Sequence, residues 1–341
     1  MPARNALRFV RRHIRRMVRR ALRNSLQRRG RPVRSQELTA YPLSPIDAAT
    51  LWPQMPRLDT EVVATRSSEN LLLRSGIAAI GLAHLPHVPR TSVLGVKRGL
   101  RYRAVVVTRE LAGGSAWEVV SLRLARDIDN DAVECLLGAA ANEMVRRGGK
   151  RLLMRYAESS PHEDAVLGAG LRPFVAEQLY AIPSRNVLPG NGPFRTVVRS
   201  DRPALFRLYC RAVPESVRRN EALTQQEFRA IYDSHDVAHE FALDLEAGMG
   251  LWVGIGGREA RVMAGTVPRE SLDLSLDLIE AQPSRAATLV VAEYQPEVAS
   301  CAEARGYALM GTRLVSARRM AILNPLKEVA AGISETIPVP Q

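Results

Sequence analysis

Arginines, whose guanidinium groups bind anions, are concentrated at the N-terminus. Thirteen arginines and no acidic residue lie within Met1–Arg34. Arginine pairs bidentately with phosphate, so this segment could bind a polyanion. The whole chain has 48 Lys+Arg against 35 Asp+Glu, and without the segment each sign counts 35. The basic character therefore belongs to an appendage rather than to the body of the protein.

The same segment has the period of a helix. Apolar residues recur every three or four positions from Leu7 to Ala21, arginines cover most of the remaining surface, and Gly30 and Pro32 end the pattern. Residues 1–35 are therefore predicted to form an Arg-rich amphipathic helix. Three roles stay open: binding a polyanion such as nucleic acid, lying on an anionic membrane surface, or docking on the protein's own body or on a protein partner.

The other ligating side chains form no recognisable motif. His84 with His87, and His235 with His239, have the spacing of a metal pair, but no cysteine or carboxylate completes either site. The three cysteines lie far apart in the sequence, so neither a metal site nor a disulfide framework is expected. The sequence contains no Walker loop, no G-x-S-x-G elbow and no G-x-G-x-x-G after a strand.

The apolar residues argue against membrane insertion. No apolar run reaches the roughly 18 residues of a membrane span, and arginines interrupt every run that a signal peptide would need. We therefore expect no transmembrane segment and a cytoplasmic protein. The appendage leaves a position at the membrane surface or the nucleoid open, and the oligomeric state is open as well.

The body of the chain contains an internal repeat at a constant offset of 136 residues. Each copy has the pattern of a strand, a short helix, a glycine that ends the helix and a second strand; the glycines are Gly170 and Gly306. A repeat of this size indicates a duplicated domain. A stretch rich in proline and glycine separates the copies. We predict a domain over 36–183, a linker over 184–193, a second domain over 194–323 and a tail over 324–341.

Periodicity predicts further elements in each half. The first half is expected to contain helices at 68–82 and 131–147 and strands at 102–108, 117–124 and 150–156. The helix between the last two strands implies a crossover connection.

The second half is expected to contain helices at 202–213 and 225–234, and strands at 251–255, 261–267 and 272–279. Only about ten residues then remain before the repeated strand at 289, so no crossover helix is expected in this half.

This order of elements resembles two tandem GNAT-type N-acetyltransferase domains, the second of them degenerate. The resemblance covers roughly residues 40–183 and, more weakly, 193–323. It implies an α/β fold with a mixed sheet (α+β), built from two tandem GNAT-like acyl-CoA N-acyltransferase domains behind a basic amphipathic helix. It also implies acetyl-CoA as the acyl donor and an amine, on a small molecule or a protein, as the acceptor.

The resemblance also implies a cofactor site. In the family, a strand leads into a loop of pattern Gln/Arg-x-x-Gly-x-Gly/Ala, and amides at the following helix N-terminus hold the CoA pyrophosphate. The matching positions here are Leu122, Leu124, Arg126, Asp127, Asn130, Asp131 and Ala132. Asn130 replaces the central glycine and Asp127 the Gln/Arg, and one nearby carboxylate can weaken diphosphate binding about a hundredfold. The alternative is that Asp129, Asn130 or Asp131 only caps the helix.

Catalysis in this family needs a base and an acid. Glu118, on the strand before the loop, is the candidate base. The tyrosine expected before each helix-ending glycine is replaced by Val166 and Ala302. Tyr156 and Tyr294 could substitute as acids if the geometry allows, with core packing as the alternative.

The second half has no phosphate loop, and a structural or substrate-shaping role is expected for it. The alternative to an enzyme is a catalytically inactive GNAT-like scaffold, whose Arg-rich helix binds a polyanion or a protein partner.

Overall fold

The computed structural model describes residues 39–63, 90–183 and 190–320, with gaps at 45, 46, 48, 49, 59, 127, 236, 247 and 283–285. These residues belong to one compact unit, Thr39–Gln341. The predicted N-terminal helix (1–35), the helix at 68–82 and the tail at 324–341 lie outside the described residues and stay predictions. None of the described helices has the length and apolar character needed to cross a bilayer.

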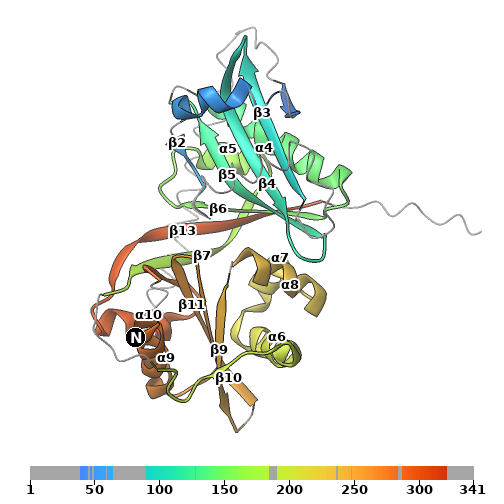
Figure 1. Cartoon of the computed structure of the whole chain (residues 1–341). Helices are drawn as coiled ribbons and strands as arrows, with labels where there is room; N and C mark the ends of the chain where they lie inside the picture. The colour runs from blue at the N-terminus through green and yellow to red at the C-terminus, as the bar shows by residue number, and fades with distance from the viewer. Residues whose placement is uncertain are drawn as a thin grey trace, which may run out of the picture. The chain divides into compact units, whose positions relative to one another are not determined.

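The described strands form one mixed sheet of 13 strands (Figure 1). The first half contributes β1 (Ala40–Pro42), β2 (Thr60–Glu61), β3 (Thr91–Arg98), β4 (Arg101–Glu110), β5 (Ala116–Leu124), β6 (Arg151–Ala157) and β7 (Arg172–Ala181). The second half contributes β8 (Arg195–Thr196), β9 (His239–Leu245), β10 (Gly248–Gly256), β11 (Glu259–Ala264), β12 (Thr288–Ala292) and β13 (Ala308–Arg319). β5–β6 and β11–β12 are parallel pairs within an otherwise antiparallel sheet, which confirms the predicted mixed α/β fold.

Helices cover this sheet in both halves. The first half has α4 (Asn130–Arg146) and α5 (Glu163–Gly168). The second half has α6 (Arg202–Ala212), α7 (Glu215–Glu221), α8 (Gln225–Ser234), α9 (Arg269–Ala281) and α10 (Pro296–Ala304). Short 3-10 turns lie at Trp52–Arg57 and Arg199–Asp201.

Several local predictions are confirmed. The long helix α4 connects β5 to β6 as a crossover. Gly170 and Gly306 follow α5 and α10 with φ angles of 83° and 80°, the left-handed conformation that ends a helix. Thr224 and Glu227 form the capping box of α8.

The two halves exchange their last strands. β13 lies between β6 and β7 and is antiparallel to both, while β7 also pairs with β12 (Figure 1). At the centre of the β7–β13 pair, Arg313 lies opposite Glu177, and these two residues are separated by the 136-residue repeat offset. The two residues therefore occupy equivalent positions of the predicted repeat, and the two halves share one sheet.

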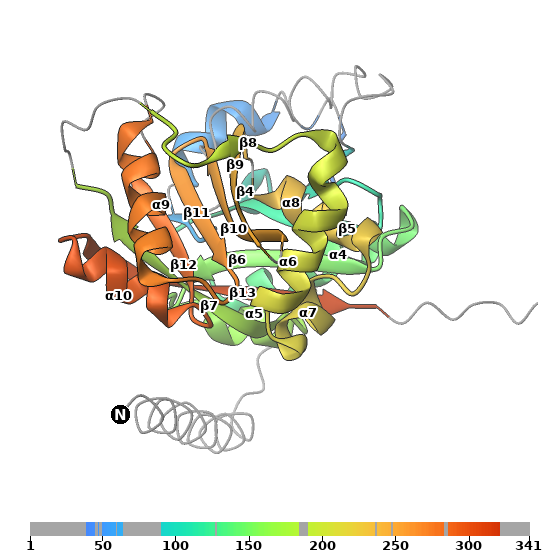
Figure 2. The same ribbon diagram turned by 90° about the horizontal axis from the view of Figure 1, so that it is seen from below.

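Two helical layers enclose the second half of the sheet, as Figure 2 shows. Alternate residues of β10 separate the layers: Leu251 and Val253 pack with α9 and α10, whereas Trp252 packs with α6 and α8. This alternation follows from the two-residue period of a strand. The face covered by α6, α7 and α8 is the one that carries the cavity described below.

The strand predicted at 272–279 is wrong, because these residues form α9, and the second half does have a crossover helix between β11 and β12. Four leucines alternate with polar residues there, which is the pattern of a strand. However, Leu272, Leu276 and Ile279 are buried at helical spacing, while Leu274 is 39% exposed. Packing of this segment on β10 and β11 therefore selects a helix, although the local alternation of residues favours a strand.

Leu276→Ala should lower the free energy of unfolding by about 2–5 kcal/mol, because it leaves a cavity against the sheet. Leu274→Ala is the matched control and should change it by less than about 0.5 kcal/mol, since the side chain is exposed on the same helix. Urea unfolding followed by circular dichroism measures both. Equal losses for the two leucines would contradict the helical placement.

Candidate active site

The loop predicted to hold the donor diphosphate is closed by a helix cap. Asp129 is the N-cap of α4, and its carboxylate accepts a hydrogen bond from the Ala132 amide at 2.9 Å. Asn130 Oδ1 lies 3.0 Å from Nδ1 of His162. Asp131 and Arg126 are exposed, and Asp127 lies outside the described residues. Asp129 thus caps the helix, as the alternative interpretation of the sequence expects. The cap occupies the Ala132 amide, one of the donors that a diphosphate would need.

The strand before this loop is also occupied. β5 and β6 pair over four residues, from Ala116–Arg151 to Val119–Met154, and then diverge. The chain's own segment 60–63 runs into the gap. β2 pairs with the end of β5 at Leu124, and the amide of Val62 donates to the carbonyl of Leu122 at 3.1 Å. On this edge the carbonyl of Leu122 is therefore already engaged by an amide of the chain itself.

Glu118, the candidate base, is fully buried. Its Oε1 accepts from Nη1 of Arg155, and its Oε2 lies 3.5 Å from Nη2 of Arg109. Arg155 also donates to Ser234 at the end of α8, so this network ties the first half to the second. Both carboxylate oxygens of Glu118 are therefore engaged by guanidinium groups of the chain itself. The assignment of Glu118 as base stays a prediction, and the position favours a structural role.

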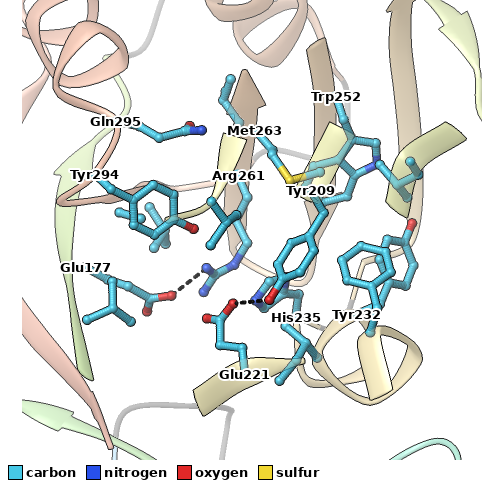
Figure 3. A pocket seen from close by; sticks show the side chains of 18 residues that line it. Glu177, Tyr209, Glu221, Tyr232, His235, Trp252, Arg261, Met263, Tyr294 and Gln295 are labelled. Carbon is cyan, nitrogen blue, oxygen red and sulfur yellow. Dashed lines mark hydrogen bonds and ion pairs between the residues drawn. The ribbon is translucent and has the colours of Figure 1, made fainter. Parts of the chain in front are cut away.

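The second half diverges in the same way, and its gap is open. β11 and β12 pair over three residues, ending at Arg261–Val290, and then separate. Met154 and Val290, the last paired residues of β6 and β12, are related by the repeat offset. No backbone segment of the described residues pairs with β11 beyond this point on that side. A cavity lies there instead (Figure 3).

The cavity has mixed apolar and ionisable walls. Its volume is about 60 Å³, which is enough to hold water molecules. The lining residues come from β7, α6, α7, α8, β10, β11, β12 and the segments that follow α6, α8 and β12: Val175, Glu177, Leu205, Tyr209, Val213, Glu221, Phe228, Ile231, Tyr232, His235, Trp252, Arg261, Val262, Met263, Val290, Ala292, Tyr294 and Gln295.

Glu221 is the distinctive acid of this cavity. It is 8% exposed at the end of α7, and its Oε2 accepts from the Tyr209 hydroxyl at 3.1 Å (Figure 3). Burial raises the pKa of Glu221 to about 7. Among the described residues no arginine, lysine or histidine forms an ion pair with it. A carboxyl group whose pKa lies near neutrality is suited to take up and release a proton.

Two further groups face the same space. Tyr294 directs its hydroxyl toward the centre of the cavity in Figure 3, and within the described chain this oxygen has no hydrogen-bond partner. Burial raises the pKa of Tyr294 well above its usual value, so the hydroxyl keeps its proton. For His235, burial and then the positive charge of Arg261 lower the pKa well below its usual range, so the ring is neutral.

Glu177 and Arg261 form a charged wall that is balanced. Glu177 accepts from Arg261 at 2.7 Å and also pairs with Arg313 and Arg155. Glu259 takes the other terminal nitrogen of Arg261 at 3.1 Å. The arginines hold the pKa of Glu177 well below its usual range. Glu177 is therefore a permanent anion, and Arg261 has both terminal nitrogens on carboxylates.

The backbone carbonyl of Ala264, at the edge of β11, is an acceptor that an amide group of a donor molecule could use. Ala264 lies three residues beyond the last β11–β12 pair, as Leu122 does beyond the last β5–β6 pair. The carbonyl of Ala264 accepts from the side-chain amide of Gln295 at 3.1 Å. In the first half the equivalent acceptor is held by a backbone strand; here it is held by a rotatable side-chain amide. An amide group therefore fits this acceptor, although residues 265–268 lack the glycine pattern that the resemblance in sequence predicts for a diphosphate loop.

The sequence identified only part of this site. Tyr156 and Tyr294 were the two predicted substitute acids. Tyr294 lines the cavity, whereas Tyr156 is fully buried on β6. The histidine pair is divided: His235 lines the cavity, and His239 is exposed at the start of β9. Glu221 and Tyr209 were not predicted, because only burial and proximity distinguish them. The described residues contain no group of three or more His, Cys, Asp or Glu that could hold a metal ion.

Comparison with known proteins gives a likeness of backbone only. No model of a known protein family matches the sequence, and no curated protein matches it. Among solved structures, a tandem GNAT protein from the clavulanic acid biosynthesis pathway has 14% identity and a TM-score of 0.47, over 84% of this chain and 99% of that one. A GCN5-related N-acetyltransferase from Sphaerobacter thermophilus has 11% identity and a TM-score of 0.48, over 84% and 98%.

Proposed function

We propose that the chain is a CoA-dependent N-acyltransferase, that acetyl-CoA is its donor, and that the reaction centre lies in the second half. The observation that supports this most is the divergence of β11 from β12 over a cavity that contains Glu221, Tyr209 and Tyr294. The proposal keeps two repeats, 36–183 and 194–323, joined by a linker at 184–193. A cytoplasmic location belongs to the same proposal.

The chain's own residues can perform the proton transfers of an acyl transfer. When bound, the donor supplies a thioester carbon as electrophile. Glu221 takes a proton from the acceptor ammonium, so that a neutral amine nitrogen can attack. The Tyr209 hydroxyl, on Glu221 Oε2, orients the carboxylate. Tyr294 holds a proton that it can give to the leaving sulfur. The carbonyl of Ala264 would hold an amide of the donor arm once Gln295 turns away.

Gln295→Ala should bind acetyl-CoA about fivefold more tightly than the unmodified chain, because the donor no longer displaces a hydrogen bond worth about 1 kcal/mol. Asn130→Trp is the first-half control and should leave the affinity unchanged, since it fills the mouth of α4 instead. Isothermal titration calorimetry on the full chain measures both.

The two variants distinguish donor binding in the first half of the chain from donor binding in the second half. If Asn130→Trp abolished binding and Gln295→Ala had no effect, the donor would bind at the loop predicted from the sequence, and the second-half assignment would be wrong. Failure of the unmodified chain to bind acetyl-CoA at millimolar concentration would overturn the acyltransferase proposal itself.

A further inference from the structure

The walls of the cavity point to the chemistry of the acceptor. Four aromatic rings adjoin one another along one side, and all four line it: Tyr209, Phe228, Tyr232 and Trp252. Ring centroids are 4.7 Å apart for Tyr209–Phe228, 6.1 Å for Phe228–Tyr232 and 5.8 Å for Tyr232–Trp252. Aromatic faces attract cations and also accept alkyl groups.

One charged group of the cavity has no ion-pair partner among the described residues. Glu177 has three arginine partners, and Arg261 has two carboxylate partners. Glu221 accepts one hydrogen bond, from the neutral Tyr209 hydroxyl, and Arg155 and Arg261 act on it only from beyond ion-pair distance. A positive charge directly beside a buried carboxylate favours its ionised form. A ligand with one positive charge could supply that direct partner.

The cavity offers little to a negatively charged group on the ligand. Among the described lining residues Arg261 is the only arginine or lysine; both its terminal nitrogens are on Glu177 and Glu259, and only its Nε lacks a hydrogen-bond partner. A substrate carboxylate would therefore meet Glu177 and Glu221 with a single N–H of Arg261 as its cationic partner. An amino acid is disfavoured relative to a plain amine of the same length.

The size of the cavity limits the length of the acceptor. The cavity has a volume of about 60 Å³, so only a few non-hydrogen atoms fit inside. We propose that the acceptor is a short aliphatic primary amine that binds as its ammonium ion, with the nitrogen at Glu221 and the alkyl chain against the aromatic rings. This inference rests on the proposed acyl-acceptor role of the cavity and names the substrate class for it.

The test needs no acyl donor. The full chain is titrated calorimetrically at pH 8 with propylamine, and with 1-propanol, β-alanine and hexylamine as matched probes that change charge, add a carboxylate or add length. Propylamine should bind at least tenfold more tightly than each of the other three. Glu221→Gln should weaken propylamine at least tenfold, and the surface variant Leu274→Ala should leave it unchanged.

Equal binding of propylamine and 1-propanol, or unchanged propylamine binding by a folded Glu221→Gln, would overturn the inference. The probe series on the unmodified chain decides the matter even if Glu221→Gln fails to fold. Because acetyl-CoA is absent, the result is separate from the proposed function: amine binding without acetyl-CoA binding would leave an amine-binding protein, and the reverse would leave an acyltransferase with another acceptor.

Discussion

Glu221→Gln should lower the rate of acyl transfer by about 10²- to 10⁴-fold while acetyl-CoA affinity stays unchanged. The amide keeps the shape of the side chain and can still accept from Tyr209, but it cannot take up a proton. In the unmodified chain the rate should rise with pH around a midpoint near 7, as Glu221 loses its proton. Steady-state kinetics between pH 5.5 and 8.5, run for both proteins, measure the rate and the profile.

The same substitution has a consequence for stability whose sign is opposite to the usual acidic case. The folded pKa of Glu221 is about 7 and the ordinary value is 4.5, so the native state holds the proton more tightly than the unfolded state. The resulting stabilisation is complete below pH 4.5 and is lost as the pH rises through 7. The stability of Glu221→Gln relative to the unmodified chain should therefore increase by at most about 3 kcal/mol from pH 4 to pH 8.5.

Two outcomes would contradict this role. A variant that keeps the rate and the pH profile would show that another group takes the proton. A loss of rate with a matching loss of acetyl-CoA affinity would place Glu221 in donor binding instead of proton transfer.

Local patterns in the sequence predicted the elements that have strong local causes. The helix α4, the capping box at Thr224 and the glycines after α5 and α10 all depend on residues close in the chain. α9 was missed, because alternating leucines imitate a strand and only packing on the sheet selects the helix. The exchange of β7 and β13 joins residues more than a hundred positions apart, and no local pattern encodes it.

The candidate site was harder to predict than the fold. The predicted loop has the residues of a helix cap, and Asp129 acts as one. Nothing in the sequence indicates that segment 60–63 enters the gap beside β5, because this depends on a backbone pairing. Glu221 ends a helix of seven residues, α7, that has no clear period. Its importance comes from burial without a cationic partner, and this is a property of the folded structure alone.

Glu118→Ala should lower the free energy of unfolding by about 3–5 kcal/mol, because it leaves Arg109 and Arg155 buried without their shared carboxylate. Both guanidinium groups keep secondary partners, since Arg109 reaches Asp233 at 3.5 Å and Arg155 reaches Glu177 at 3.6 Å. The rate of acyl transfer per folded molecule, measured well below the melting temperature, should change by less than about threefold. Denaturant unfolding and kinetics on the same preparation give both quantities.

A double-variant cycle shows whether the loss comes from unpaired charge. Glu118→Leu combined with Arg155→Met replaces a buried ion pair by apolar groups, which restores much of the stability if desolvation of the pair offsets its attraction. Arg155 also donates to Ser234 and pairs with Glu177, and Arg109 loses Glu118, so the recovery should be incomplete by at least one hydrogen bond, roughly 1 kcal/mol. A large loss of rate by Glu118→Ala at unchanged stability would instead identify Glu118 as the base that the sequence predicts. The reaction centre would then lie in the first half, and β2 would have to leave the gap beside β5 before a donor could enter.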